Sequence, residues 1–327
     1  MIRFTVRTAV PQLALLSGVV LLYSAVHAQP FPSRPIRIVV PFPPGGTSDI
    51  LSRTIGQKLT EEWGQTVITD NRPGAAGNIA SEFVAKSKGD GYTLYINTVG
   101  THAINPAIYA KLAFDPLKDF TAITNLVNLQ SVLLTHPSLP VKSVKDLIAL
   151  AKRRPGELTY SSAGSGAQPH LTAEMFKSMA GVNLLHVPYK GAGPQMIALI
   201  SGEAALTFAT APSGVPLAKN GQARAIGVSG ATRLPALPDT PTISETLPGY
   251  LAIGWNGLLG PAAMPAPVLE KIHATVSKIV RTPEIRDKLI GLGAEPALST
   301  PAEFAELMRN ELAKWAKVVK DSGAKLD

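Results

Sequence analysis

Two sets of short loops carry the residue types that could hold a small ligand. The first set comprises residues 43–49, 73–78 and 96–98, and the second comprises residues 163–166, 189–193 and 208–210. Glycines in these loops let backbone N–H groups approach a ligand closely. The first two loops of each set open a helix-like run, and helix N-termini favour anions. The pattern therefore predicts a small anionic ligand, with a carboxylate held at each end.

Side chains of the loops add hydroxyl donors and a few cations. The hydroxyl groups belong to Thr47, Thr98, Ser162, Ser165 and Thr210. The nearby cationic candidates are Lys190, His170 and His102. Each has a structural alternative: Lys190 as a solvated charge, His170 as a locally bonded helix residue, and Gly45 with Gly46 as a tight turn. We expect Asp49 to brace its loop, because an anionic ligand would repel its carboxylate.

Catalysis finds little support in these motifs. Ser165, His170 and Asp49 could form a nucleophilic set, because such triads are recognised by geometry rather than order. However, residues 164–166 are not the G-x-S-x-G elbow of hydrolases, and no H-E-x-x-H helix occurs. Gly45 and Gly46 belong to neither a P-loop nor a G-x-G-x-x-G fingerprint. We predict a non-enzymatic protein with no catalytic residue, no metal site and no cofactor.

Strand-like and helix-like runs alternate around the loops, which predicts the α/β class. Strands are expected at 36–40, 66–69, 92–97, 158–161, 184–187 and 204–208, with amphipathic helices between them. This order favours parallel sheets, whose ligands bind beyond the carboxyl ends of the strands. Any α/β protein could show such a repeat, but the matched loop sets favour two facing lobes.

Two apolar segments could carry the chain between the lobes. Residues 123–134 are β-rich and could run from one lobe to the other, and residues 250–259 could return. Two crossing strands would make a natural hinge. Three further helices are expected at 267–281, 283–292 and 301–319, each with proline near its first position.

The N-terminus resembles a secretory signal peptide. Arg3 and Arg7 precede a short apolar run at 13–26, and residues 26–28 suit a cleavage site. We predict export to the periplasm with cleavage after Ala28. The alternative is an uncleaved membrane anchor, but the apolar run is short for a membrane-spanning helix, which needs ~20 residues. About 300 of the 327 residues remain, which is enough for two lobes.

Composition narrows the class of partner. The chain has no cysteine, which excludes disulfides and thiolate metal sites. Its formal net charge of +8 is dispersed, without the aromatic-interleaved basic stripe of nucleic-acid modules. The positive potential instead suits anionic small ligands or surfaces.

Several motifs in order resemble the Bug-type solute receptors of tripartite tricarboxylate transporters. They comprise residues 39–49, 71–78, 90–94, 186–191, 237–242 and 292–296, and the resemblance runs from about Pro35 to Asp327. It implies a type II periplasmic binding fold, with two doubly wound lobes joined by two crossing strands. We expect lobe 1 at 29–127 and 256–327, and lobe 2 at 128–255.

The resemblance also implies a function. It suggests a monomeric periplasmic receptor that captures a small organic carboxylate and delivers it to a large and a small integral membrane subunit, with no nucleic acid involved. An exported enzyme or a sensor-input protein acting on a similar anion is the alternative. The ligand residues implied by the matching positions and loops are Phe42, Pro44, Gly45, Gly46, Thr47, Asp49, Asn78, Thr98, Ser162, Ala163, Gly164, Ser165, Gly166, His170, Tyr189, Lys190, Gly191, Ala209 and Thr210.

This chain departs from the family pattern in its second half. Many relatives have an Asp-Asn pair where this chain has Ala209 and Thr210, and Gln168-Pro169 replaces a commoner polar pair. We expect the first lobe to supply the common carboxylate grip and the second to select the ligand. Exchanging Ala209-Thr210 for Asp-Asn is predicted to change ligand preference more than stability.

Overall fold

Parallel strands of two separate groups are joined by long antiparallel strands. The computed structural model describes residues 1–2 and 31–322, without the side chains of 318–322, and the chain from Phe31 onward forms one unit. The predicted signal peptide falls on residues outside the described ones. Within the described residues the sheet order is β2-β1-β3-β9-β4-β7-β5-β6, and β8 and β10 also pair with β4. The strands are β1 (Ile36–Val40), β2 (Val67–Asn71), β3 (Thr93–Thr98), β4 (Phe120–Thr135), β5 (Thr159–Ser162), β6 (Leu185–Pro188), β7 (Leu206–Thr210), β8 (Arg224–Val228), β9 (Ile253–Pro261) and β10 (Ala294–Pro296).

We call β2-β1-β3 the first subsheet and β7-β5-β6 the second subsheet. The strands inside each subsheet are parallel, whereas β9 and β4 pair antiparallel with their neighbours. The predicted crossing segment at 123–134 is confirmed as part of β4. This strand pairs with β9 up to Gln130 and with β7 from Ser131 onward.

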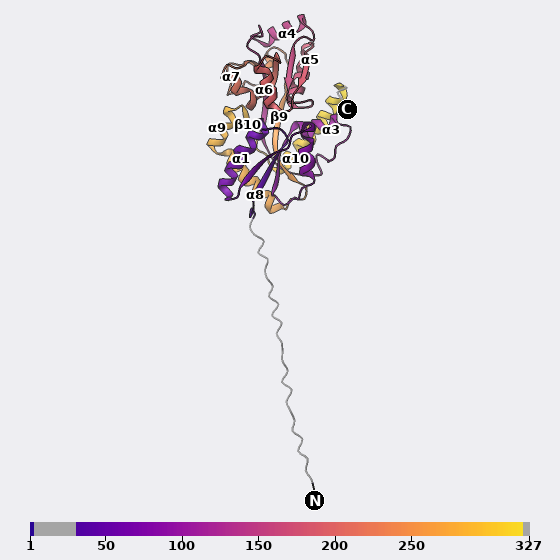
Figure 1. The fold of residues 1–327 in the computed structure, drawn as a ribbon, viewed down its shortest axis with the longest axis vertical. Helices are drawn as coiled ribbons and strands as arrows, with labels where there is room; N and C mark the ends of the chain where they lie inside the picture. Colours follow the sequence, from indigo (N-terminus) through magenta and orange to yellow (C-terminus); the bar gives the residue numbers. More distant parts are fainter. Residues whose placement is uncertain (3–30, 323–327) are drawn as a thin grey trace. The chain divides into compact units, whose positions relative to one another are not determined.

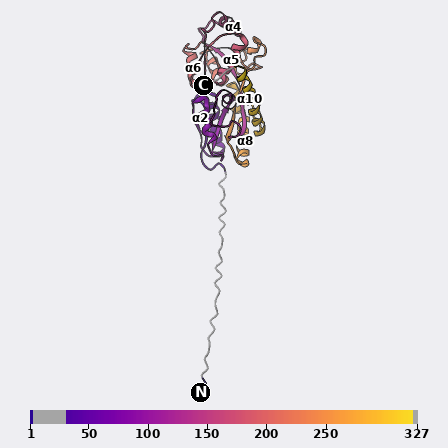
Figure 2. The same cartoon turned by 90° about the vertical axis from the view of Figure 1, so that its right-hand side faces the viewer.

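Helices cover both subsheets. In Figure 1, α4 to α7 surround the upper part of the ribbon, and α1, α8 and α10 surround the lower part; Figure 2 shows the same arrangement from the side. The helical segments are α1 (Thr47–Trp63), η1 (Ala75–Gly77), α2 (Asn78–Ala85), η2 (Gly100–Ile104), α3 (Asn105–Ile108), α4 (Val144–Arg153), α5 (Gln168–Ala180), α6 (Ala192–Ile200), α7 (Ala211–Lys219), η3 (Ile243–Glu245), α8 (Ala266–Arg281), α9 (Pro283–Gly291) and α10 (Pro301–Ser322).

Local sequence explains most of these elements. In α1, Leu51, Ile55 and Leu59 recur on one face and are buried, and Gly64 ends the helix in the left-handed conformation. The three C-terminal helices are confirmed, each with proline in its first turn. The elements that the sequence did not predict are α3, α7, β8, β10 and the short turns η1, η2 and η3, of which η2 is π-helical.

The apolar core follows the two subsheets. One cluster packs Ile38 and Leu94 against α1 and α8, and another packs Tyr95 and Val39 against α2 and α10. Two further clusters surround β5 to β8, for example at Phe208. Each subsheet is therefore held rigid by its own helices, which fixes the loops at its carboxyl edge.

Candidate ligand-binding site

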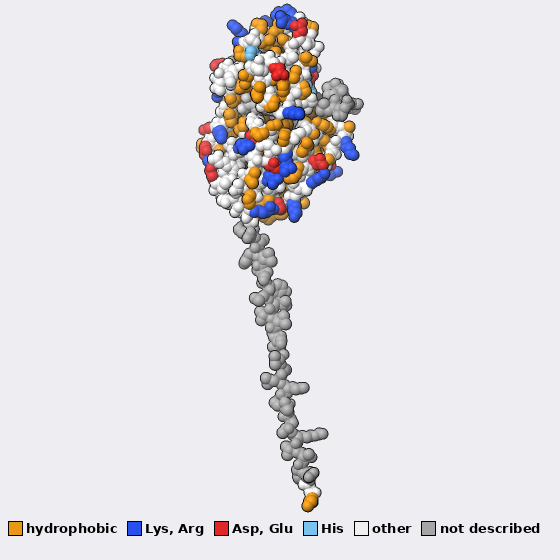
Figure 3. Space-filling model, in the orientation of Figure 1, with side chains coloured by type: hydrophobic (Ala, Val, Ile, Leu, Met, Phe, Trp, Pro, Cys, Tyr) orange, Lys and Arg blue, Asp and Glu red, His pale blue; other side chains and the backbone are white. Residues whose placement is uncertain are grey.

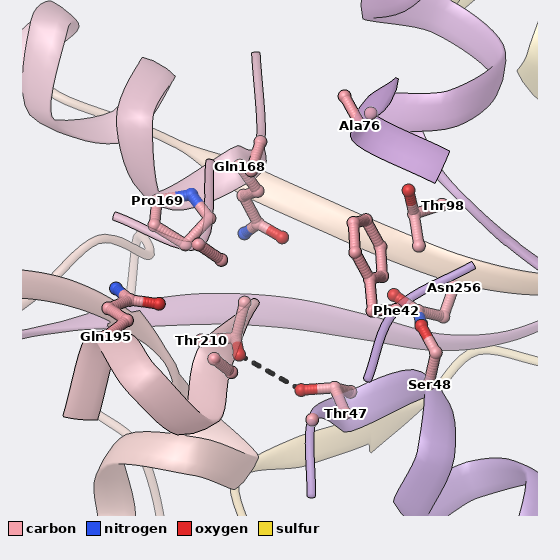
Figure 4. A pocket seen from close by; sticks show the side chains of 15 residues that line it. Phe42, Thr47, Ser48, Ala76, Thr98, Gln168, Pro169, Gln195, Thr210 and Asn256 are labelled. Atoms are coloured by element: carbon pink, nitrogen blue, oxygen red, sulfur yellow. Dashed lines mark hydrogen bonds between the residues drawn. The ribbon is translucent and has the colours of Figure 1, made fainter. Parts of the chain in front are cut away.

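A pocket lies where the loops of the two subsheets meet. Its walls come from the carboxyl ends of β1, β3, β5 and β7, together with the starts of the helices that follow (Figure 4). The lining residues are Phe42, Gly46, Thr47, Ser48, Ala76, Thr98, Gly100, Ala163, Ala167, Gln168, Pro169, Ala192, Gln195, Thr210 and Asn256.

Four helix N-termini converge on this pocket. α1, α5, α6 and α7 contribute lining residues from their first turns or cap positions, and none of the four has a side chain capping its N-terminus. First-turn N–H groups have no partner inside a helix, and the helix dipole adds positive potential at the same end. The pocket is therefore suited to bind an anion through backbone groups.

In the part of the chain that the structure describes, no residue lining the pocket carries a charged side chain. The predicted cations lie elsewhere: Lys190 is exposed, and His102 is fully buried against Phe114 and Phe120. Burial lowers the pKa of His102 to about 3, so its ring is neutral. On the face shown in Figure 3, basic and acidic side chains are interspersed. Anion recognition in this pocket therefore depends on N–H and O–H groups.

The two loop sets touch across the pocket. Thr47 Oγ1 lies 3.0 Å from Thr210 Oγ1 in a hydrogen bond that joins the first subsheet to the second (Figure 4). A Cβ added to Gly46 would lie 3.7 Å from Ala192 Cβ, and one added to Gly191 would lie 2.8 Å from Pro43 Cδ. The loops have only small groups at these contacts, which permits this close approach.

Asp49 braces the first loop, as its sequence position predicts. Its carboxylate accepts hydrogen bonds from Gly45 N at 3.0 Å, Asn71 Nδ2 at 3.1 Å and Arg53 Nε at 3.0 Å. Burial alone would raise its pKa, but the hydrogen bonds from Arg53, Gly45 and Asn71 lower it below the ordinary value. Asp49 is therefore an anion that orders the loop from behind rather than a lining residue.

A histidine cluster supports the loop at 163–167. The rings of His170 and His186 stack with centroids 4.1 Å apart, and His170 Nδ1 accepts from Gly166 N at 3.1 Å. Ser162 Oγ lies 2.6 Å from His186 Nε2. Burial lowers the pKa of His170, and burial with the neighbouring His170 lowers that of His186 to about 4. Neutral rings can accept these hydrogen bonds, so the cluster holds the loop in place.

The structure does not assemble the nucleophilic set considered from the sequence. Asp49 accepts a hydrogen bond from Arg53 behind the loop at 43–49, whereas the ring of His170 stacks on His186 behind the loop at 163–167. Ser162 approaches a histidine, but its side chain is fully buried. A substrate has no access to its hydroxyl.

Thr98 is held by a network beneath the pocket floor. Thr98 N donates to Thr101 Oγ1 at 3.0 Å, and Thr101 N donates back to Thr98 Oγ1 at 3.2 Å. Thr101 Oγ1 lies 3.0 Å from His102 Nδ1. Thr101 and His102 belong to the π-helical turn η2, which follows β3, and π-helical turns are frequent at functional sites.

The pocket takes in some of the sequence-predicted residues and leaves others behind its walls. Those that line it are Phe42, Gly46, Thr47, Thr98, Ala163 and Thr210. The predicted residues outside its lining are Pro44, Gly45, Asp49, Asn78, Ser162, Gly164, Ser165, Gly166, His170, Tyr189, Lys190, Gly191 and Ala209. Of these, Asn78 accepts a hydrogen bond from Asn105 Nδ2 at 2.7 Å, and Ala209 is fully buried in an apolar cluster.

The predicted ligand residues omit several that line the pocket, although Ser48, Ala76 and Ala192 lie in the predicted loops and Gln168-Pro169 is one of the departures from the family pattern. Three are amides: Gln168 at the start of α5, Gln195 within α6 and Asn256 within β9. The other missed residues are Ser48, Ala76, Gly100, Ala167, Pro169 and Ala192. A signal for Asn256 was available, because an amide within an apolar strand needs hydrogen-bond partners.

Among the described residues, no helix combines the length and the apolar character that crossing a bilayer requires.

Known proteins resemble the chain over almost its whole length. A family model described as the tripartite tricarboxylate transporter family receptor matches residues 51–324. The protein in the tcbD-tcbE intergenic region of Pseudomonas sp. (strain P51) is 35% identical over 291 residues, which cover 88% of this chain and 86% of that protein. Protein BugT of Bordetella pertussis is 31% identical over 303 residues, covering 92% and 93%.

Solved structures share the fold. An R. palustris protein solved with adipate is 39% identical with a TM-score of 0.88, covering 90% of this chain and 100% of that one. MatC from Rhodopseudomonas palustris, with bound malate, is 31% identical with a TM-score of 0.82, covering 88% and 100%. The periplasmic binding protein BugD has a TM-score of 0.86 at 28% identity, over 90% and 99%. The expected periplasmic-binding-protein fold is confirmed.

Proposed function

We propose that this chain, which belongs to the tripartite tricarboxylate transporter receptor family and is thus a solute receptor rather than an enzyme, captures a small organic carboxylate in its pocket. The observation that carries the proposal is the convergence of four uncapped helix N-termini on a pocket with no charged lining residue. Carboxylates bound to two similar structures, adipate and malate, support the same ligand class.

The candidate site residues divide into two roles. Those that line the pocket would contact the ligand, with Thr47, Thr98 and Thr210 offering hydroxyl groups. Those behind it, such as Asp49 and His170, would hold the loops in the binding geometry. This division predicts that substitutions in the second group weaken binding indirectly.

The chain would close on its ligand as two lobes. One would comprise residues 29–127 and 256–327, and the other residues 128–255, with β4 and β9 as the crossing strands. The separate apolar clusters of the two subsheets support this division. Small-angle scattering should show a smaller radius of gyration with ligand; an unchanged radius would argue against closure.

Export and delivery complete the proposal. The segment before Gln29 would be a signal peptide cleaved after Ala28, and the mature monomer would deliver ligand to a large and a small membrane subunit, with no nucleic acid as a partner. Mass measurement of the periplasmic protein tests cleavage directly. Retention of residues 1–28 would instead indicate an anchor.

Thermal-shift measurements with a panel of carboxylates test the central claim. A ligand that binds only the folded state stabilises it by RT ln(1 + [L]/Kd), or ~2.7 kcal/mol at a hundredfold excess over Kd. The ligand should be recovered chemically unchanged. Absence of stabilisation by every acid would refute carboxylate binding, and chemical turnover would refute the receptor function.

A further inference from the structure

Three amide side chains in the pocket have their N–H groups occupied by protein acceptors. Gln168 Nε2 donates to Leu129 O at 3.1 Å, and Gln195 Nε2 donates to Thr207 Oγ1 at 2.7 Å. Asn256 Nδ2 donates to Ser48 Oγ at 2.8 Å. Each amide is thus left with its carbonyl oxygen for other partners.

For the two glutamines, this orientation is fixed by the partner. Leu129 O is a backbone carbonyl and can only accept, so the NH₂ group of Gln168 must face it. Thr207 Oγ1 donates its own proton to Ser161 O at 2.7 Å and therefore accepts from Gln195. The oxygen ends cannot exchange with the nitrogen ends without losing these hydrogen bonds.

The three amide oxygens face the pocket and lack a protein donor. Figure 4 shows the oxygen ends of Gln168, Gln195 and Asn256 directed into the space that the lining residues surround. Gln195 and Asn256 are almost completely buried, with 1% and 3% of their surface exposed. Within the described part of the chain, no donor reaches any of the three oxygens.

These oxygens are available to accept hydrogen bonds from donors on a ligand. An ionised carboxylate only accepts hydrogen bonds, so a plain aliphatic dicarboxylate offers no donor to them. A buried acceptor left without a donor is unfavourable, and binding sites built around polar partners reject analogues that lack them. The pocket therefore combines N–H groups for a carboxylate with carbonyl oxygens for a second kind of group.

Electrostatics distinguishes between an uncharged donor and a cationic one. An ammonium group would meet the positive ends of four helices, and no acidic side chain lines the pocket to offset them. A hydroxyl group donates a hydrogen bond without a positive charge. Building on the proposed function, we infer that the ligand is a hydroxycarboxylate, with a hydroxyl group donating to at least one of the amide oxygens of Gln168, Gln195 and Asn256.

Matched acids test the inference by isothermal titration calorimetry. One series is succinate, malate and aspartate, which share four carbons and differ in carrying hydrogen, hydroxyl or ammonium. The second is adipate, 2-hydroxyadipate and 2-aminoadipate, with six carbons. In at least one series the hydroxy acid should bind tenfold or more tightly than both of its counterparts.

Substitutions connect this preference to the amide oxygens. Gln168→Met and Gln195→Met keep a similar length but remove the acceptor. Because one hydroxyl donates one hydrogen bond, at least one of the two variants should reduce the preference for the hydroxy acid threefold or more. Gln130→Met is the matched control. Gln130 is also buried, but both ends of its amide are already bonded, to Thr232 O and Gly230 N. The control should retain the wild-type preference.

The outcomes separate the inference from the function on which it rests. Equal binding of plain and hydroxylated acids, or preference for the amino acids, would overturn the inference and leave carboxylate binding intact. An unchanged preference in both glutamine variants would overturn the assignment of these oxygens. If neither series binds, the inference is overturned. If no acid of the wider carboxylate panel binds either, the proposed function is overturned as well.

Discussion

His102 should make the fold less stable in acid, by an amount that the structure allows to be calculated. Its ring is fully buried among Tyr95, Phe114 and Phe120, and among the described residues Nε2 has no hydrogen-bond partner. Burial lowers its pKa from 6.5 to about 3. As the pH falls below 6.5 the unfolded chain takes up a proton that the folded protein does not, so stability is present above 6.5 and is lost toward pH 3.

The size of the loss at pH 4.5 follows from the unfolded state. At pH 4.5 the folded protein, with a His102 pKa of about 3, remains unprotonated at this ring. The unfolded chain, with a pKa of 6.5, is protonated, and pH 4.5 lies two units below that value. At 1.36 kcal/mol per unit, His102 should account for ~2.7 kcal/mol of stability lost between pH 7 and pH 4.5.

Urea denaturation of the wild type and His102→Gln at both pH values measures this contribution. The variant should be less stable at pH 7 but should lose ~2.7 kcal/mol less on acidification. Phe120→Leu, in the same aromatic cluster, is the control: it should lower stability without changing the loss between the two pH values. Equal losses in the wild type and His102→Gln would refute the reasoning, since the buried ring would then be protonated in the folded state.

Three further substitutions have definite expected effects. Gly46→Val adds methyl groups toward Ala192, whose Cβ would lie only 3.7 Å from the new Cβ, so we expect ligand affinity to fall at least 100-fold. The unfolding free energy should change by only about 1 kcal/mol, because the backbone at Gly46 is already extended and suits valine. Wild-type affinity in calorimetry would show that the loops do not meet in the bound state. The burial of Ala209 reverses the expectation from the sequence that an Asp at this position changes ligand preference more than stability. Ala209→Asp places a carboxylate in a fully buried apolar site beside Gly214, so stability should fall by several kcal/mol; a fold of wild-type stability with changed ligand preference would contradict this. Phe304→Ala empties the space over Gly257 and should cost ~3–5 kcal/mol in urea denaturation, and a cost below about 1 kcal/mol would mean that the surrounding residues collapse into the space.

The order of elements could be read from the sequence because it depends on local patterns. The buried run at 36–40, the apolar face of α1 and the prolines that begin the C-terminal helices each act within one segment. Asp49 was also predictable, since an acidic residue in the first turn of a helix can bond the loop before it. Local rules suffice for such features.

The pocket lining was harder to predict because it depends on how two subsheets face each other. Asn256 lies inside β9, outside every predicted loop, and Gln195 follows the loop at 189–193 but lies one turn into α6. Conversely, His170 lies in the first turn of α5, but its ring stacks on His186 behind the loop. Only the packing of helices and strands decides which side of a loop a side chain reaches.

The absence of ionisable side chains from the lining of the pocket has a bioenergetic consequence. A lining built from hydroxyls, amides and backbone groups can neither take up nor release a proton when a ligand enters. As long as His170 and His186 stay neutral, the pH dependence of affinity should then follow the ligand's own ionisation. A ligand would leave this receptor in the protonation state in which it was captured, so any coupling of uptake to a proton gradient would have to arise after release.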